Sequence, residues 1–112
     1  MKIAIIGSRS ADENCASLVK KSIPAECSEI ISGGARGIDA IANKIAGDMG
    51  ILCKNIFPDY DTYGRMAPLQ RNISIIEEAD YVLAFWDYKS TGTRFVISEC
   101  IKRKIPFRIF KI

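Results

Sequence analysis

The stretch Glu29–Met49, EIISGGARGIDAIANKIAGDM, decides the fold class, because an apolar run, a glycine-rich turn and a helical pattern follow one another in it. The run EIIS predicts a short strand over Glu29–Ser32. After the turn, apolar side chains recur at helical spacing and form the clearest amphipathic pattern of the chain: Ile38, Ile41, Ala42, Ile45, Ala46 and Met49. Gly50 then suits the residue that ends a helix. This strand–turn–helix unit is typical of α/β folds.

The same unit recurs on both sides of this stretch. Apolar runs rich in β-branched and aromatic residues predict four further strands, at 2–6, 51–57, 81–86 and 107–112. Helical patterns predict three further helices, at 12–22, 68–78 and 93–103. Five strands joined by four helices predict a parallel sheet with right-handed crossovers. We therefore expect a Rossmann-like, three-layer α/β domain with the strand order 3-2-1-4-5 and the last strand at an edge.

The helical patterns also predict which side chains face the core. Asp12 is the expected N-cap of the first helix. The side chains expected to point inward from the first, third and fourth helices are Cys15, Leu18, Val19, Ser22, Leu69, Ile73, Ile76, Val96, Ile97, Cys100 and Ile101. Between them, residues 58–67 (PDYDTYGRMA) show no period and predict a long loop, a kind of segment that often carries function.

Size and composition indicate one globular domain spanning residues 1–112. Hydrophobic residues make up 48% and charged residues 26%, and the net charge of +3 is too small to indicate nucleic-acid binding by itself. The cations Lys102–Lys104 suit the end of a helix better than a DNA-binding patch. The N-terminal apolar run stops at Ile6, too early for a signal peptide or a membrane span, so we expect a cytoplasmic protein without membrane contact.

The residues available for chemistry are restricted. The chain has no histidine, and its four cysteines lack metal-binding spacing, so we expect no metal and no cofactor. Any catalysis would have to use carboxylate, lysine, tyrosine or cysteine side chains. Whether the protein is an enzyme therefore stays open at this stage.

Three loops at the carboxyl ends of predicted strands share one composition. They are Gly7–Ser10, Ser32–Gly37 and Asp87–Thr93, and each combines glycine, hydroxyl side chains and at least one cation. Each also leads into a helix, whose free N–H groups and dipole favour an anion. No loop matches a P-loop or a GxGxxG motif. The three loops together predict a site for a phosphate-containing ligand, most simply a nucleotide, at the switch point of the sheet.

The candidate ligand-binding residues come from these loops and from the helix before the fourth strand. They are Gly7, Ser8, Arg9, Gly33, Gly34, Ala35, Arg36, Gly37, Asp39, Arg71, Asn72, Trp86, Asp87, Ser90, Gly92 and Thr93. Several have a structural alternative.

Asp39 either stabilises a helix N-terminus or accepts a ligand hydroxyl. Trp86 either belongs to the core or stacks on a base. Arg9 and Arg36 clamp phosphate, or pair with nearby carboxylates such as Asp12 or Asp39.

Six motifs together resemble the SLOG superfamily, which joins the DNA-processing protein DprA (Smf) to the LOG phosphoribohydrolases: Gly7–Arg9, Ile31–Asp39, Arg71–Asn72, Ala79–Asp80, Ala84–Asp87 and Ser90–Thr93. The resemblance covers almost the whole chain and is greatest to the stand-alone YspA branch, the cpYpsA-related SLOG proteins. It implies a Rossmann-like domain that binds nucleotides or nucleotide-derived ligands, often as a homodimer.

The resemblance also implies a limit on catalysis. LOG enzymes cleave a nucleoside monophosphate at its N-glycosidic bond with an arginine and a glutamate. Arg71 matches that arginine, but Val96 stands at the glutamate position, and Ser90 and Thr91 replace two glycines. LOG-like hydrolysis would therefore need another acid, such as Asp87 or Asp39.

Three functions remain as hypotheses. The first is nucleotide binding, for example as a sensor, and the second is LOG-like hydrolysis. The third is DprA-like binding of single-stranded DNA, against which the chain shows a modest charge and no interleaved aromatic platforms in its sequence.

Overall fold

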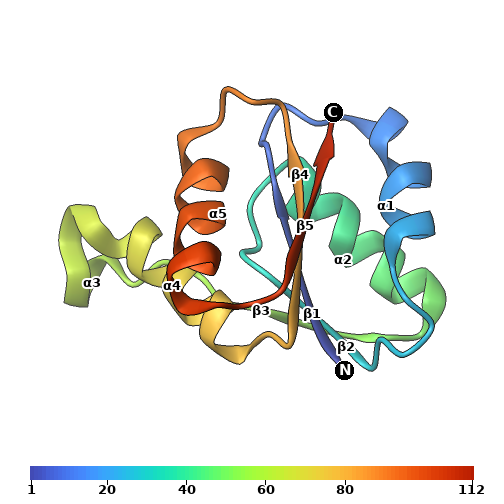
Figure 1. Cartoon of the computed structure of the whole chain (residues 1–112), viewed down its shortest axis with the longest axis horizontal. Helices are drawn as coiled ribbons and strands as arrows, with labels where there is room; N and C mark the ends of the chain where they lie inside the picture. Colours follow the sequence, from blue (N-terminus) through green and yellow to red (C-terminus); the bar gives the residue numbers. More distant parts are fainter.

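The computed structural model describes residues 1–112 and contains one five-stranded parallel sheet (Figure 1). The strand order is β3-β2-β1-β4-β5, which confirms the predicted fold class and topology. The strands are β1 (Lys2–Gly7), β2 (Glu29–Ser32), β3 (Leu52–Asn55), β4 (Tyr81–Trp86) and β5 (Phe107–Lys111). β1 and β4 pair along five residues at the centre of the sheet, where the chain changes its direction of winding. Ligands of open α/β sheets bind at this switch point.

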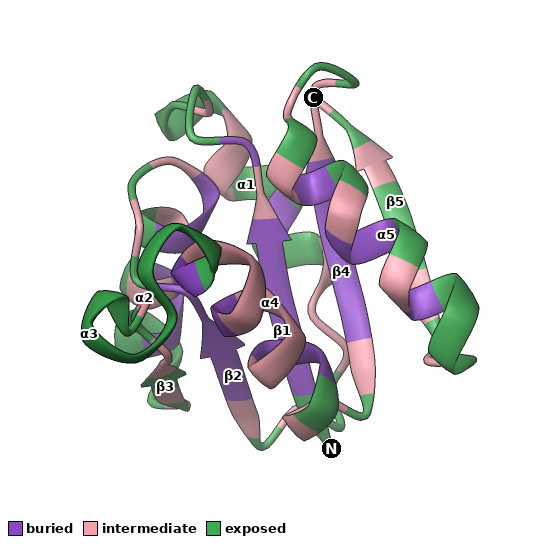
Figure 2. Ribbon diagram, turned by 90° about the vertical axis from the view of Figure 1, so that its left-hand side faces the viewer, coloured by how far each residue is buried: buried purple, intermediate pink, exposed green.

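Helices cover both faces of the sheet (Figure 1). α1 (Ala16–Ser22) and α2 (Ile38–Met49) lie on one face, and α4 (Ala67–Glu78) and α5 (Thr91–Arg103) lie on the other. Each face has its own buried apolar cluster, one around Ile5 and Phe85 and one around Ile31 and Val96. Figure 2 shows β1 and β4 buried along most of their length, as expected for central parallel strands. No helix is long and apolar enough to cross a bilayer.

Short helical turns occur at two places where the sequence predicts something else, namely the start of the helix expected at 12–22 and the loop expected at 58–67. Asp12 caps the 3₁₀ turn η1 (Glu13–Cys15), which precedes α1. Residues 58–67, expected to be a loop, contain α3 (Tyr60–Tyr63) and the 3₁₀ turn η2 (Gly64–Met66) before α4 begins. The Asp59 carboxylate starts α3 by accepting the Thr62 N–H at 3.2 Å, a local capping bond that periodicity does not show. α3 projects beyond the helical layers in Figure 1.

Some side chains face differently from the predicted pattern. Leu18 on α1 and Ile101 on α5 are exposed, because each lies at the margin of its helix's apolar face, while Val19 and Cys100 reach the core. On α4, the buried side chains are Ala67, Arg71, Ile75 and Ile76, whereas Leu69 and Ile73 are only partly buried. The inner face of α4 is thus rotated from the expected one, and it carries a charged side chain.

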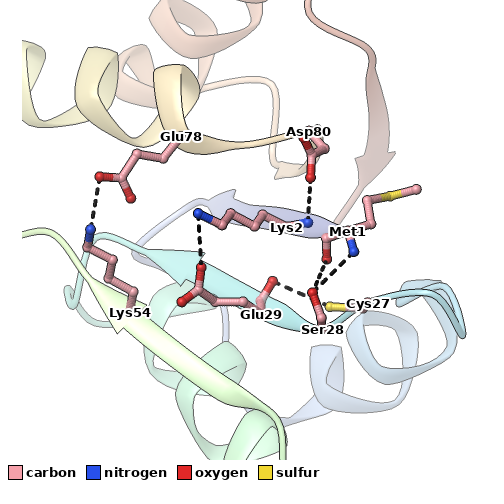
Figure 3. Close-up of polar contacts among 8 residues, drawn as sticks. All are labelled: Met1, Lys2, Cys27, Ser28, Glu29, Lys54, Glu78 and Asp80. Carbon is pink, nitrogen blue, oxygen red and sulfur yellow. Dashed lines mark hydrogen bonds and ion pairs between the residues drawn. The ribbon is translucent and has the colours of Figure 1, made fainter.

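The amino edge of the sheet is closed by polar contacts within the protein (Figure 3). The backbone N–H of Lys2 donates to the Asp80 carboxylate at 2.7 Å. Lys54 pairs with Glu78 at 2.9 Å, and the Lys2 ammonium lies 3.9 Å from Glu29. The side-chain cations of Lys2 and Lys54 therefore already have carboxylate partners, whereas the N-terminal ammonium of Met1 donates to the Glu26 carbonyl and the Ser28 hydroxyl.

Candidate functional site

A cavity of about 880 Å³ opens at the opposite, carboxyl edge of the sheet. This volume is in the range of pockets that hold small molecules. All three predicted loops contribute to its lining, through Arg9, Gly33, Arg36, Ser90 and Gly92 among others. α4 closes one side with Pro68, Leu69, Arg71, Asn72 and Ile75. The structure thus brings the three loops to one pocket.

The first loop, Gly7–Ser10, is held against the end of β4. The Ser8 N–H donates to the Phe85 carbonyl at 3.1 Å, and the Ser8 hydroxyl accepts the Asp87 N–H at 3.1 Å. Ser8 is buried and does not line the cavity, so its role is to join two strand ends. Arg9 is exposed, lines the cavity and forms no ion pair.

The second loop, Ser32–Gly37, needs glycine for two different reasons. Gly37 has φ +76°, and a Cβ there would meet the Ser8 carbonyl oxygen and lie 2.7 Å from the Arg9 Cα. Gly34 has φ +68° and packs against the Phe57 ring. Neither glycine lines the cavity, so both shape the loop. Ala35 and Arg36 line the cavity, and Arg36 is exposed without an ion-pair partner.

The third loop is organised by the Asp87 carboxylate. It accepts the backbone N–H groups of Lys89 and Ser90, both at 2.8 Å, and the Ser10 hydroxyl lies at 3.3 Å. The two backbone hydrogen bonds lower the pKa of Asp87 to about 2. Asp87 is therefore ionised at neutral pH, which makes it unsuited to donate a proton as an acid.

The N-terminus of α5 opens into the same cavity. Ser90 is its N-cap, and the Ser90 hydroxyl accepts the Thr93 N–H at 3.5 Å and the Thr93 hydroxyl at 3.2 Å. The helix begins at Thr91, two residues earlier than predicted, because Ser90 takes the capping position. A Cβ at Gly92 would meet nothing within 4 Å, so this position borders open space.

Trp86 braces the third loop. Its indole N–H donates to the Ser90 carbonyl at 3.0 Å, and its ring meets the edge of Tyr88 with centroids 4.8 Å apart. Trp86 does not line the cavity. The neighbouring Tyr88 is 55% exposed, and the Lys111 ammonium lies 5.5 Å from its ring centroid.

Two buried charged side chains form the floor of the cavity. Asp39 accepts the Ala35 N–H at 3.1 Å, and Arg71 donates to the Gly33 carbonyl at 2.8 Å and to the Asn72 side chain at 2.9 Å. Each is only 8% exposed. Burial raises the pKa of Asp39, against the opposing effects of the Ala35 N–H and the Arg71 cation, and burial lowers the pKa of Arg71.

The charges around the cavity favour an anion. Arg9, Arg36, Arg71 and Lys89 line it and have no ion-pair partner, whereas the lining carboxylates of Asp39 and Asp87 accept backbone N–H groups. Val96, which the family resemblance sets against the LOG glutamate, is a buried apolar part of the wall. No group of three or more His, Cys, Asp or Glu side chains is placed to hold a metal ion.

The sequence reasoning missed several exposed aromatic rings. Tyr88 borders the third loop, and Phe57 and Tyr60 belong to the projecting segment that leads to α4, with exposed fractions of 65% for Phe57 and 60% for Tyr60. Tyr60 and Tyr88 lie in the stretches PDYDTYGRMA and DYKS, and Phe57 directly precedes the first of them, but the exposure of a ring depends on how these turns pack. None of these three rings lines the cavity, so the expectation that the chain lacks interleaved aromatic platforms stays a prediction.

Comparison with known proteins gives three matches. The family model for DNA recombination-mediator protein A matches residues 1–59, which contain the first two loops. Gene 61 protein of Mycobacterium phage D29 is 37% identical over 83 residues, covering 69% of this chain and 66% of that protein. The X-ray structure of DNA processing protein A (DprA) from Streptococcus pneumoniae superposes with a TM-score of 0.81 and 20% identity. That match covers 96% of this chain but only 49% of the DprA chain, so it shows a shared fold.

Proposed function

This chain belongs to the DNA recombination-mediator protein A family, and we propose that its carboxyl-edge cavity binds a nucleotide unit of single-stranded DNA through the phosphate. One observation carries the proposal: the lining cations Arg9, Arg36 and Lys89 have no carboxylate partner in the protein. A phosphate would supply that partner, and arginine can hold two of its oxygens at once. The N-terminus of α5 adds free N–H groups beside them.

The exposed aromatic rings support a strand as the ligand. Single-strand binders combine a cationic groove with rings on which bases stack. Tyr88 belongs to the third loop and Phe57 packs against Gly34 of the second, and both rings are exposed. Tyr60 offers a further exposed ring on α3. The cation of Lys111 next to Tyr88 adds positive charge at one of these rings.

A free nucleotide is the second candidate ligand, because the cavity volume of about 880 Å³ suits a molecule of that size. Residues 1–112 would then act as a single nucleotide-binding domain, as the resemblance to the YspA branch of SLOG proteins implies. Hydrolysis of that nucleotide is not part of the proposal. Val96 stands where the LOG resemblance expects the catalytic glutamate, and the lowered pKa of Asp87 keeps that carboxylate ionised.

The binding experiment uses a fluorescent oligothymidylate, the matching duplex and AMP as three probes. We expect Arg9→Ala and Arg36→Ala each to weaken the preferred probe by about 1.5–3 kcal/mol, the range for a hydrogen bond to a charged group. Lys20→Ala is the matched control, since Lys20 is an exposed cation on α1 away from the cavity. Each lost phosphate contact should also reduce the salt dependence of single-strand binding by about 0.7 in log–log slope.

The three probes separate the candidates. Tighter binding of the single strand than of AMP supports the DNA proposal, and the reverse order supports the free nucleotide. Arginine variants that bind every probe like the unaltered protein would contradict phosphate binding at this cavity.

We also propose that the protein forms a homodimer through α4 and α5, as the family resemblance implies. Ile101 on α5 is 63% exposed, and such an apolar side chain suits an interface. Light scattering at micromolar concentration should give twice the mass of 12.4 kDa, and Ile101→Glu should reduce it to one chain. A single-chain mass for the unaltered protein would reject the dimer.

A further inference from the structure

Asp39 and Arg71 face each other across Gly33 at the floor of the cavity. A Cβ added to Gly33 would lie 2.7 Å from the Arg71 Nη1 and 2.9 Å from the Asp39 Oδ2. By the triangle inequality, these two atoms are at most about 5.6 Å apart. They nevertheless form no ion pair, so their separation exceeds 4.0 Å. One hydrogen-bonding atom of a ligand can therefore reach both groups.

Both side chains keep capacity for a ligand. Arg71 donates from Nε to the Asn72 side-chain oxygen and from Nη1 to the Gly33 carbonyl oxygen. Its Nη2 forms no hydrogen bond in the protein. The Asp39 carboxylate accepts the Ala35 N–H at Oδ2 and is also stabilised by the Ser32 hydroxyl, but a carboxylate has about four lone-pair sites. Because both residues are more than nine-tenths buried and line the cavity, bulk water satisfies them poorly.

The opposite charges restrict what can bind between them. A phosphate there would meet the Asp39 carboxylate, and an ammonium would meet the Arg71 guanidinium. A neutral group that donates to Asp39 and accepts from Arg71 suits both. A hydroxyl does this with a single oxygen atom, whereas the edge of a base donates and accepts at separate atoms.

We propose that Asp39 and Arg71 form a subsite for a sugar hydroxyl of the bound nucleotide. The hydroxyl donates its proton to the Asp39 carboxylate, and its oxygen accepts from the Arg71 guanidinium. This inference rests on the proposed function, since the phosphate on Arg9 and Arg36 places the sugar in the cavity. The hydroxyl has two sources, the 2′- or 3′-hydroxyl of a ribonucleotide or the 3′-hydroxyl at the end of a DNA strand.

The experiment measures calorimetric affinity for ligands that differ only in hydroxyl groups. The free ligands are AMP, 2′-deoxy-AMP and 2′,3′-dideoxy-AMP, and the strand ligands are oligothymidylates with a 3′-hydroxyl or a 3′-deoxy end. The proteins are the unaltered chain, Asp39→Asn and Arg36→Ala. Asparagine keeps an oxygen for the Ala35 N–H, but it removes the charge and replaces the second accepting oxygen with an NH₂ group. A thermal melt checks that the variant is folded.

We expect the unaltered chain to bind the fully hydroxylated member of one series about 10- to 100-fold more tightly than the member without hydroxyls. In Asp39→Asn the ratio should fall below about threefold, because the charged acceptor is gone. Arg36→Ala should weaken both members equally and keep the ratio. A purely structural Asp39 would change all affinities together and leave the ratio unchanged.

The outcomes separate this inference from the proposed function. Discrimination in the AMP series assigns the hydroxyl to a free nucleotide, and discrimination in the oligonucleotide series assigns it to a strand end. Equal affinity within both series overturns the hydroxyl subsite, while an effect of Arg36→Ala would still support phosphate binding. Absence of binding to every ligand overturns both proposals.

Discussion

The parallel sheet has two regions whose cationic side chains differ in whether a carboxylate of the protein lies beside them. At the amino edge Lys2 lies beside Glu29, and on the edge strand β3 Lys54 pairs with Glu78, so the protein neutralises these two side-chain cations itself (Figure 3). At the carboxyl edge, Arg9, Arg36 and Lys89 line a cavity and have no such partner. The difference teaches that cations paired within the chain connect elements of the fold, whereas unpaired cations around a cavity are available to an anionic ligand.

The carboxyl edge is itself divided between supporting and lining residues. Ser8, Gly37 and Trp86 hold the loops together through contacts that point away from the cavity. Asp39, Arg71 and Gly92 border the cavity. Substitutions in the first group should therefore alter folding, and substitutions in the second should alter binding.

The largest effect should come from Gly37. Gly37→Ala places a Cβ against the backbone of the first loop at a positive φ, so we expect about 3 kcal/mol or more of lost stability, visible in chemical denaturation. Gly92→Val is the matched control. It should leave a folded protein, because open space surrounds that position, but abolish ligand binding. Full ligand affinity in Gly92→Val would remove the third loop from the site.

A smaller effect should appear in acid, where the carboxylates of this edge titrate. Hydrogen bonds from Lys89 and Ser90 lower the folded-state pKa of Asp87 to about 2, below its ordinary value near 4. Its contribution to stability is present above pH 4 and is lost as the pH falls towards 2. Between pH 5 and 2, the free energy of unfolding from chemical denaturation should therefore fall less steeply in Asp87→Asn than in the unaltered protein.

The Asp39 carboxylate should change the pH dependence of stability in the opposite direction to Asp87. Burial raises its folded-state pKa, so its ionisation costs stability as the pH rises through about 4 and beyond. In Asp39→Asn this decrease should disappear, and stability at neutral pH should be maintained or increased. Equal pH profiles for the Asp87 and Asp39 variants would contradict the distinction between a loop-organising and a cavity-lining carboxylate.

The smallest effects should come from exposed cations at the two edges. Lys54→Ala should lower stability by no more than about 1 kcal/mol, since the Lys54–Glu78 pair is partly exposed, and leave ligand binding unchanged. Arg36→Ala should leave the melting temperature of the ligand-free protein unchanged but reduce the ligand-induced shift. The two edges would not differ as described if Arg36→Ala melted early without ligand.

The sequence by itself determined the order of the elements and the loops that meet at the site. Short apolar runs, the amphipathic pattern of α2 and Gly50 at its end predict the fold because they are local signals of buried strands and of a helix and its cap. Loops that follow parallel strands must meet at one edge of a sheet. The convergence of Arg9, Arg36 and Gly92 could therefore be predicted without coordinates.

Only the tertiary structure decided which side chains become buried together at the floor of the cavity and which stay exposed around it. The rotation of α4 that buries Arg71, the approach of Arg71 and Asp39 across Gly33, and the exposure of Tyr60 depend on packing between distant segments. Periodicity records which face of one element is apolar, but it carries no distance between elements. A buried arginine interrupts the apolar pattern of α4, so its place at the floor of the cavity follows from three-dimensional contacts alone.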